Sequence, residues 1–289
     1  MANLKEVKNR ISSVISTQQI TKAMKMVAAA KLRKAQDRIL QMRPYAQKLA
    51  EVLENVSAGL EAGANKYSLD REENHILIIA ISSDRGLCGP FNTNIFKAAV
   101  NLIHEKYETQ YKAGDLTVLT IGKKSTEFFK KRKYNVVDDF SDMFHHLSFA
   151  KARQAAGFVM QGYREEKFDK VEIVYNEFKN VATQVIRTEQ FLPIKEAEGE
   201  QDMSNDYIFQ PSQEVLIEEL IPKSLKVQLY KAILESNASE HGARMTAMDK
   251  ATENADEILR DLRLTYNQTR QAAITKEILE IVAGAEALG

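Results

Sequence analysis

The residues of this chain that could do chemistry lie mainly in two glycine-containing stretches. The first, residues 82–93, reads SSDRGLCGPFNT and follows an apolar run that predicts a strand. A strand–loop–helix turn is where α/β domains hold phosphate, because the backbone amides at a helix start attract anions. Gly86 and Gly89 match neither G-x-G-x-x-G nor the P-loop, and Pro90 removes an amide that a phosphate would need. We interpret this stretch as a structural turn.

The second stretch, Gly122-Lys123-Lys124-Ser125, is similar to the end of a P-loop, but Thr117 stands where the first glycine is required. We interpret it as structural as well. His104-Glu105 opens a zinc-protease string that fails because its fifth residue is Glu108.

Three further side chains could act as ligands or nucleophiles. His145 and His146 are adjacent, so a helix would point them in different directions, and a surface pair is favoured over a metal site. Cys88 could be a nucleophile near His75, but a buried thiol acting as a small hydrophobic residue is the commoner case. No nucleophile, base and orienting group come together, so these residues indicate no catalytic site.

Two long terminal helices must position these stretches. Apolar residues recur in a heptad pattern typical of a coiled-coil seam, and this pattern predicts a helix from about Asn3, past Pro44, to an exit near Gly59. One rung is Leu4, Ile11, Gln18, Lys25, Leu32, Ile39, Ala46, Leu53 and Leu60, and the other is Val7, Val14, Thr21, Ala28, Ala35, Met42, Leu49 and Val56.

The residues from 211 onward predict a second long helix that pairs with the first in an antiparallel coiled coil. Its seam is expected at Leu225, Leu229, Ala232, Ser236, Ser239, Ala243, Thr246, Ala247, Ala251, Ala255, Ile258, Leu262, Thr265 and Thr269. Small side chains dominate this seam, so the two backbones approach closely but bury little apolar area at each contact.

Strand and helix patterns alternate between the two terminal helices. We predict strands at residues 75–82, 116–122 and 135–137, helices at about 93–107, 125–132 and 149–166, and an antiparallel hairpin at 170–178 and 182–192. The predicted fold class is therefore α/β: a long antiparallel coiled coil of the N- and C-terminal helices plus a central open Rossmann-like domain. The expected parts are residues 1–60 (first helix), 70–194 (α/β domain), 195–210 (acidic surface loop) and 211–289 (second helix).

Composition limits the class of protein. The single cysteine excludes an internal disulfide and is typical of a reducing compartment. The apolar run at residues 76–81 is far shorter than the roughly 20 residues that span a bilayer. We therefore expect a soluble protein that is not secreted.

Charge is unevenly distributed along a chain of zero net charge. Residues 1–43 carry ten Lys or Arg against two acidic residues, a net charge of +8. This favours docking on an acidic protein surface over nucleic-acid binding, because no aromatic residue for base stacking lies between Lys5 and Arg43. Gln18, Thr21 and Lys25 interrupt the seam in this segment, and we interpret them as the place where the two helices stop contacting each other.

Four stretches resemble the gamma subunit of F-type ATP synthases of the bacterial type. Residues 20–36 (ITKAMKMVAAAKLRKAQ) are similar to its N-terminal helix, and residues 82–92 to its Ser-Asp-Arg/Lys-Gly-Leu-Cys-Gly signature. Residues 239–258 (SEHGARMTAMDKATENADEI) are similar to its Ser-Glu-x-x-x-Arg-Met-x-Ala-Met string, and residues 266–288 to its terminal helix. The four stretches occur in the family's order.

The resemblance implies a rotor. In that family the terminal helices enter the ring of three alpha and three beta subunits, and the central domain lies with the epsilon subunit on the c-subunit ring in the membrane. ATP chemistry belongs to the beta subunits. By the same match, Lys22, Met24 and Lys25 would face an acidic lever segment of beta, and Arg270 and Gln271 would contact a beta loop.

The resemblance also implies a non-catalytic subunit that binds no cofactor, small-molecule substrate or nucleic acid. It would couple proton flow to ATP synthesis, or hydrolysis to pumping, on the cytoplasmic face of a bacterial inner membrane. Two other interpretations remain open from the residues alone. One is an α/β nucleotide-binding enzyme with a dimerising coiled coil, and the other is a nucleic-acid binder that uses the basic first helix.

Overall fold

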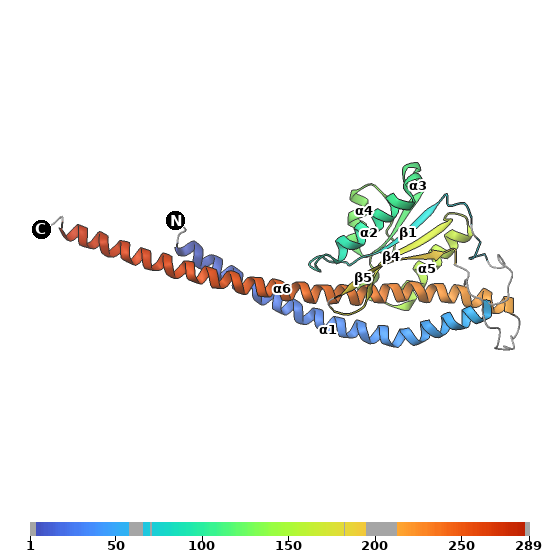
Figure 1. Cartoon of the computed structure of the whole chain (residues 1–289), viewed down its shortest axis with the longest axis horizontal. Coiled ribbons are helices and arrows are strands. Elements are labelled where there is room, and N and C mark those ends of the chain that lie inside the picture. Colours follow the sequence, from blue (N-terminus) through green and yellow to red (C-terminus); the bar gives the residue numbers. More distant parts are fainter. Residues whose placement is uncertain (1–3, 58–65, 70, 182, 195–212, 287–289) are drawn as a thin grey trace. The chain divides into compact units, whose positions relative to one another are not determined.

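The computed structural model describes residues 4–57, 66–69, 71–181, 183–194 and 213–286 (Figure 1). The chain forms two compact units, residues 1–29 with 244–289 and residues 30–243. Two long helices, α1 (Leu4–Ser57) and α6 (Gln213–Glu286), each contribute to both units. Pro44 lies inside α1, so the prediction that the helix continues past it is confirmed. The predicted exit near Gly59 and the acidic stretch at 195–210 lie outside the described residues.

The larger unit is built on a five-stranded sheet in the order β3-β2-β1-β4-β5. Its strands are β1 (Ile76–Ile81), β2 (Leu116–Ile121), β3 (Asn135–Val137), β4 (Lys170–Phe178) and β5 (Gln184–Leu192). β1 pairs in parallel with β2 and β4, β2 pairs in parallel with β3, and β5 is antiparallel to β4. The predicted strands, their parallel order and the hairpin are confirmed.

Helices cover both faces of this sheet, which explains why the apolar run of β1 has no polar interruption. Ile76, Ile78 and Ala80 pack in one apolar cluster with α2 (Phe91–Lys106) and α4 (Lys123–Lys131). Leu77, Ile79 and Ile81 pack in a second cluster with α5 (Phe149–Arg164) and with α6. The first part of α6 is therefore part of the core of the α/β unit.

Two short helices were not predicted. These are α3 (Glu108–Ala113) and a 3-10 helix at Met143–His146. None of the α3 side chains is buried, and Gly114 ends the helix in the left-handed conformation. A polar helix of less than two turns leaves no apolar period in the sequence, so pattern analysis does not detect it.

The smaller unit is an antiparallel pair formed by the start of α1 and the last part of α6. The α6 seam in this unit is buried or half-buried at Met248, Thr252, Ala255, Leu259, Leu262, Tyr266 and Thr269. The predicted seam is wrong at Ile258, which is 46% exposed, and at Thr265, which is also exposed, whereas Leu259 is 4% exposed. The small residues between Ser236 and Ala251 carry almost no hydrophobic signal, so the heptad phase could not be followed through them. Among the described residues, no helix is long and apolar enough to cross a membrane.

Candidate functional site

The usual ligand position of the α/β sheet is filled by the chain itself. In open α/β sheets the ligand crevice lies outside the carboxyl ends of two neighbouring strands whose connections run on opposite faces. Here those strands are β1 and β4. The buried hydroxyls of Ser236 and Ser239 on α6 donate to the carbonyls of Ile81 and Asn176, at 3.5 and 3.1 Å. Both serines were predicted to face the first helix, but they bond to the sheet.

The amides at the start of α4 are also occupied. Three consecutive N–H groups, at residues 123–125, donate to the loop that follows β1. Their acceptors are the Asp84 carboxylate at 3.2 Å, the Ser83 carbonyl at 3.1 Å and the Ser82 hydroxyl at 2.8 Å. A phosphate bound at this helix start would have to displace all three bonds. The two glycine-containing stretches therefore contact each other. These hydrogen bonds agree with the interpretation that both stretches have a structural role.

The remaining chemically capable side chains that the structure describes do not converge. His75 precedes β1 and Cys88 follows it, and the six-residue strand between them is about 20 Å long at roughly 3.3 Å per residue. Cys88 is buried, as predicted, and its neighbour Asn92 donates to its sulfur at 3.3 Å. His145 and His146 are exposed. Within the described ranges, no group of three His, Cys, Asp or Glu side chains could hold a metal ion.

Two buried tyrosines are hydrogen-bond donors to carboxylates. Tyr107 donates to Glu172 at 2.5 Å, and Tyr175 donates to Glu189 at 2.9 Å. Burial raises the pKa of both phenols, and the neighbouring carboxylates raise it further because they disfavour a second negative charge. Both tyrosines therefore stay protonated at neutral pH, which suits structural donors and not catalytic bases.

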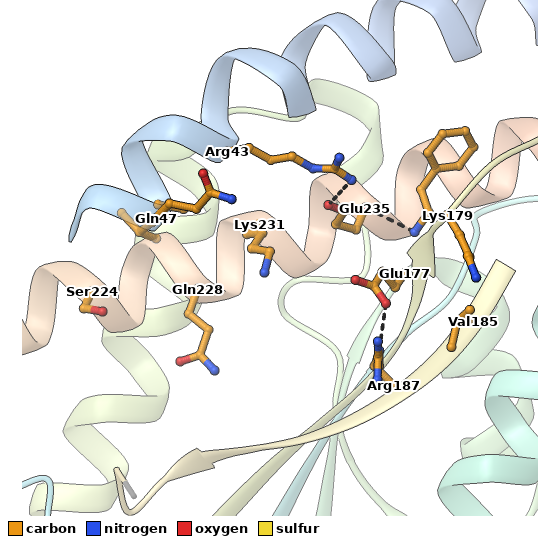
Figure 2. A pocket seen from close by; sticks show the side chains of 13 residues that line it. Arg43, Gln47, Glu177, Lys179, Val185, Arg187, Ser224, Gln228, Lys231 and Glu235 are labelled. Carbon is orange, nitrogen blue, oxygen red and sulfur yellow. Dashed lines mark hydrogen bonds and ion pairs between the residues drawn. The ribbon is translucent and has the colours of Figure 1, made fainter. Parts of the chain in front are cut away.

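A buried charge ties three elements of the larger unit together (Figure 2). The Glu235 side chain on α6 is 2% exposed and accepts from the Arg43 guanidinium on α1 at 3.2 Å. It also accepts from the backbone N–H of Phe178, at the end of β4, at 3.1 Å. One carboxylate thus holds α1, α6 and the sheet at a single point.

In the smaller unit, the polar residues of the α1 seam bond across to α6. The three pairs are Gln18 with Asp256, Thr21 with Thr252 at 2.9 Å, and Lys25 with Asp249. Each step of three or four residues forward along α1 is matched by a step of four or three back along α6. This is the register of an antiparallel coiled coil.

The prediction that the helices part at Gln18, Thr21 and Lys25 is wrong. The side chains of these residues form hydrogen bonds with polar residues directly opposite on α6, and Lys25 also forms an ion pair. The two helices therefore stay in contact through this part of the seam. A signal was present in the sequence, because Asp249 and Asp256 are seven residues apart, the same spacing as Gln18 and Lys25. Sequence reasoning considered each helix alone and missed both aspartates.

The five residues expected to contact partners lie at two places in this unit. Lys22 is exposed, Met24 is half-buried, and the Lys25 side chain is 40% exposed beside Asp249, all within one turn of α1. Arg270 and Gln271 are exposed on α6. The antiparallel register puts residue 270 opposite the start of α1, about 30 Å along the helix from Lys25 at 1.5 Å per residue.

Beyond residue 270, α6 has no described helix beside it. Every residue from 271 to 286 is exposed. This free segment, residues 271–286, presents large apolar side chains to solvent: Ile274, Ile278, Leu279, Ile281 and Val282. Exposed apolar side chains gathered on one helical segment are typical of a surface that another protein covers. Sequence reasoning named only the two polar residues at the base of this segment.

Comparison with known proteins gives one consistent result. A family described as ATP synthase matches residues 3–288. The ATP synthase gamma chain of Cytophaga hutchinsonii is 61% identical, over 100% of this chain and 99% of that protein. The gamma chain of Christiangramia forsetii is 54% identical with the same coverage.

Solved structures agree in fold. The central stalk and c-ring structure of the Tetrahymena thermophila mitochondrial ATP synthase contains a chain that is 26% identical, with a TM-score of 0.57, over 80% of this chain and 99% of that one. A chain of the Euglena gracilis mitochondrial enzyme in rotational state 3 is 23% identical, with a TM-score of 0.71, over 99% of this chain and 94% of that one. With a full-length family match and relatives above half identity, this chain belongs to the ATP synthase gamma chain family.

Proposed function

We propose that this chain is the central rotor stalk of a proton-translocating F-type ATP synthase and couples rotation to ATP synthesis or hydrolysis at sites on the beta subunits. The observation that carries the proposal is the two-helix unit with its free apolar segment, residues 271–286, in a chain of this family. Its partners are three alpha and three beta subunits, the epsilon subunit and the c-subunit ring. The titles of the similar solved structures, which name a central stalk, F1 and a c-ring, support these partners.

The chain acts without catalysing a reaction. The α/β crevice is filled by Ser236 and Ser239, and the amides at the start of α4 are bonded within the chain, which disfavours the alternative of a nucleotide-binding enzyme. Because α6 is one continuous helix from Gln213 to Glu286, a twisting force on the α/β unit reaches the two-helix unit through its backbone. Titration of the isolated chain with ATP discriminates between the two functions, since micromolar binding with turnover would favour the enzyme.

The place of action is the cytoplasmic face of a bacterial inner membrane, where the chain is held as a peripheral protein through its partners. The bacterial relatives support this placement.

Lys22, Met24, Lys25, Arg270 and Gln271 are the proposed contacts to the beta subunits. Lys22 is exposed, so its charge is available to a partner, whereas Lys25 shares its charge with Asp249. Surface ion pairs contribute only about 0–1 kcal/mol each, which is weak enough to exchange during rotation.

Reversing the charge of Lys22 is expected to weaken coupling without unfolding the chain. Lys22→Glu should lower the protons pumped per ATP hydrolysed several-fold in reconstituted vesicles, because a carboxylate would repel an acidic beta segment. Its free energy of unfolding should stay within about 0.5 kcal/mol of the parent, as for other surface substitutions. Lys97→Glu, on exposed α2 surface, is the matched control and should pump normally. Equal loss in both variants would contradict a contact role for Lys22.

Removing the free apolar segment should separate folding from function. A chain that stops after Arg270 loses only exposed side chains among the described residues, so its free energy of unfolding should change by less than about 0.5 kcal/mol. ATP synthesis by the complex reconstituted with this chain should fall at least tenfold. A chain that stops after Glu286 is the control. Full synthesis by the shorter chain would contradict the proposed function.

A further inference from the structure

A cleft of about 930 Å³ lies in the larger unit between α1, α6 and the β4–β5 hairpin (Figure 2). It is within the size range of small-molecule sites, roughly 300–1,000 Å³. Figure 2 shows Lys231 and Gln228 extending from α6 into the space between the helix and the strands. This cleft is separate from the two-helix unit to which the proposed function assigns the beta contacts.

The charges that line the cleft do not balance. Four are cationic, at Arg43, Lys179, Arg187 and Lys231, and two are anionic, at Glu177 and Glu235. Each carboxylate is already engaged by one arginine, Glu235 by Arg43 at 3.2 Å and Glu177 by Arg187 at 2.7 Å. The two lysines therefore leave a net charge of about +2 in a partly enclosed site.

Further donors face the same cleft. Neither Lys179 nor Lys231 forms an ion pair with any residue that the structure describes. Arg187 binds Glu177 through Nε, and no described residue accepts from its two terminal amino groups. Gln47, Ser224 and Gln228 add neutral hydrogen-bonding groups. The cleft thus offers positive charge and many donors to an occupant rich in oxygen acceptors.

The lining also indicates the chemical class of that occupant. Of its larger apolar residues, Phe178 and Val227 are at most 9% exposed and Val185 is half-buried, so the cleft offers no large exposed apolar anchor to a peptide and no stacking surface to a nucleic acid. Phosphate groups match donors and cations of this kind. We propose that the cleft binds a small anion with two or more phosphate groups, that Lys179 and Lys231 supply the positive charge of the site, and that the terminal amino groups of Arg187 donate hydrogen bonds to the anion.

The test is calorimetric titration of the full chain with inorganic pyrophosphate at low ionic strength. We expect saturable binding at one site that weakens as salt is added, because the attraction is electrostatic. Lys231→Gln and Lys179→Gln should each weaken binding at least fivefold, and Lys231→Arg should retain it. Lys226→Gln is the matched control, since Lys226 lies on α6 but does not line the cleft. Circular dichroism of each variant shows that the fold is kept.

A competition experiment identifies the source of the phosphate groups. Displacement of pyrophosphate by ATP would show that the cleft recognises the phosphate chain of a nucleotide, and failure to displace it would assign the cleft to free diphosphate. No saturable binding, or an equal effect of Lys226→Gln and Lys231→Gln, would overturn the proposal. Tighter binding of an acidic peptide than of pyrophosphate would also overturn it.

Discussion

Replacing Glu235 by glutamine is expected to lower the free energy of unfolding of the α/β unit by about 3 kcal/mol, more than a hundredfold in the unfolding equilibrium. The carboxylate is buried and accepts from both Arg43 and the Phe178 N–H. A glutamine has one acceptor oxygen and no charge, so it leaves the guanidinium without its counter-charge and buries an amide that cannot satisfy both donors. The value is at the low end for a buried pair because Arg43 is 43% exposed and can be partly hydrated.

Urea unfolding of the full chain, followed by circular dichroism, measures this effect. The matched control is Glu218→Gln, an exposed position on the same helix, for which the change should stay within about 0.5 kcal/mol. Equal midpoints for the two variants would mean that Glu235 does not hold the three elements together. Such a result would also remove one physical link between α6 and the sheet through which torque is proposed to pass.

The sequence predicts those parts of the fold whose residue pattern is compatible with only one arrangement of the chain. An unbroken apolar run such as residues 76–81 must be covered on both faces, which places it in the centre of a parallel sheet. The heptad pattern of α1 likewise requires a partner helix. Both features depend on residues that are close together in the sequence.

The features that the sequence did not predict depend on pairings between distant residues. Lys25 looked like an interruption until Asp249, more than 200 residues away, was placed opposite it. The side chains of Ser236 and Ser239 are small enough for a close helix pair, and their hydroxyls can also donate to strand carbonyls. The residue type alone is therefore compatible with both contacts. Only the sheet topology, which brings the ends of β1 and β4 under α6, decides between them.

The free apolar segment of α6 was missed for a related reason. Its isoleucines and leucines continue a helical pattern, and a pattern alone does not show where the partner helix ends. The start of α1 at Leu4, combined with the register of the three polar pairs, leaves residues 271–286 uncovered. Such a surface arises because α6 extends beyond the start of α1, and no sequence motif marks it.

Substituting alanine for Gly122 is expected to cost about 3 kcal/mol of folding stability or more, since it combines steric overlap with an unfavourable backbone angle. Gly122 has a φ of +96°, and an added Cβ would lie 2.3 Å from the Ser82 carbonyl oxygen. Backbone atoms cannot move aside as the end of a flexible side chain can. The shift would also break the bond from the Ser125 N–H to the Ser82 hydroxyl.

Gly157→Ala provides the matched control for this substitution. Gly157 lies inside α5 with no heavy atom within 4 Å of an added Cβ, so alanine there should be neutral or stabilise the helix by up to about 1 kcal/mol. Thermal unfolding of both variants and the parent measures the difference. A mild effect of Gly122→Ala would mean that the loop after β1 can move away from the start of α4. The three amides at residues 123–125 would then be open to an anion, and the nucleotide-binding alternative would regain its site. A large loss of stability in Gly122→Ala alone would instead show that the contact between the two loops requires this glycine. Phosphate binding would then not be needed to explain the glycine at this position.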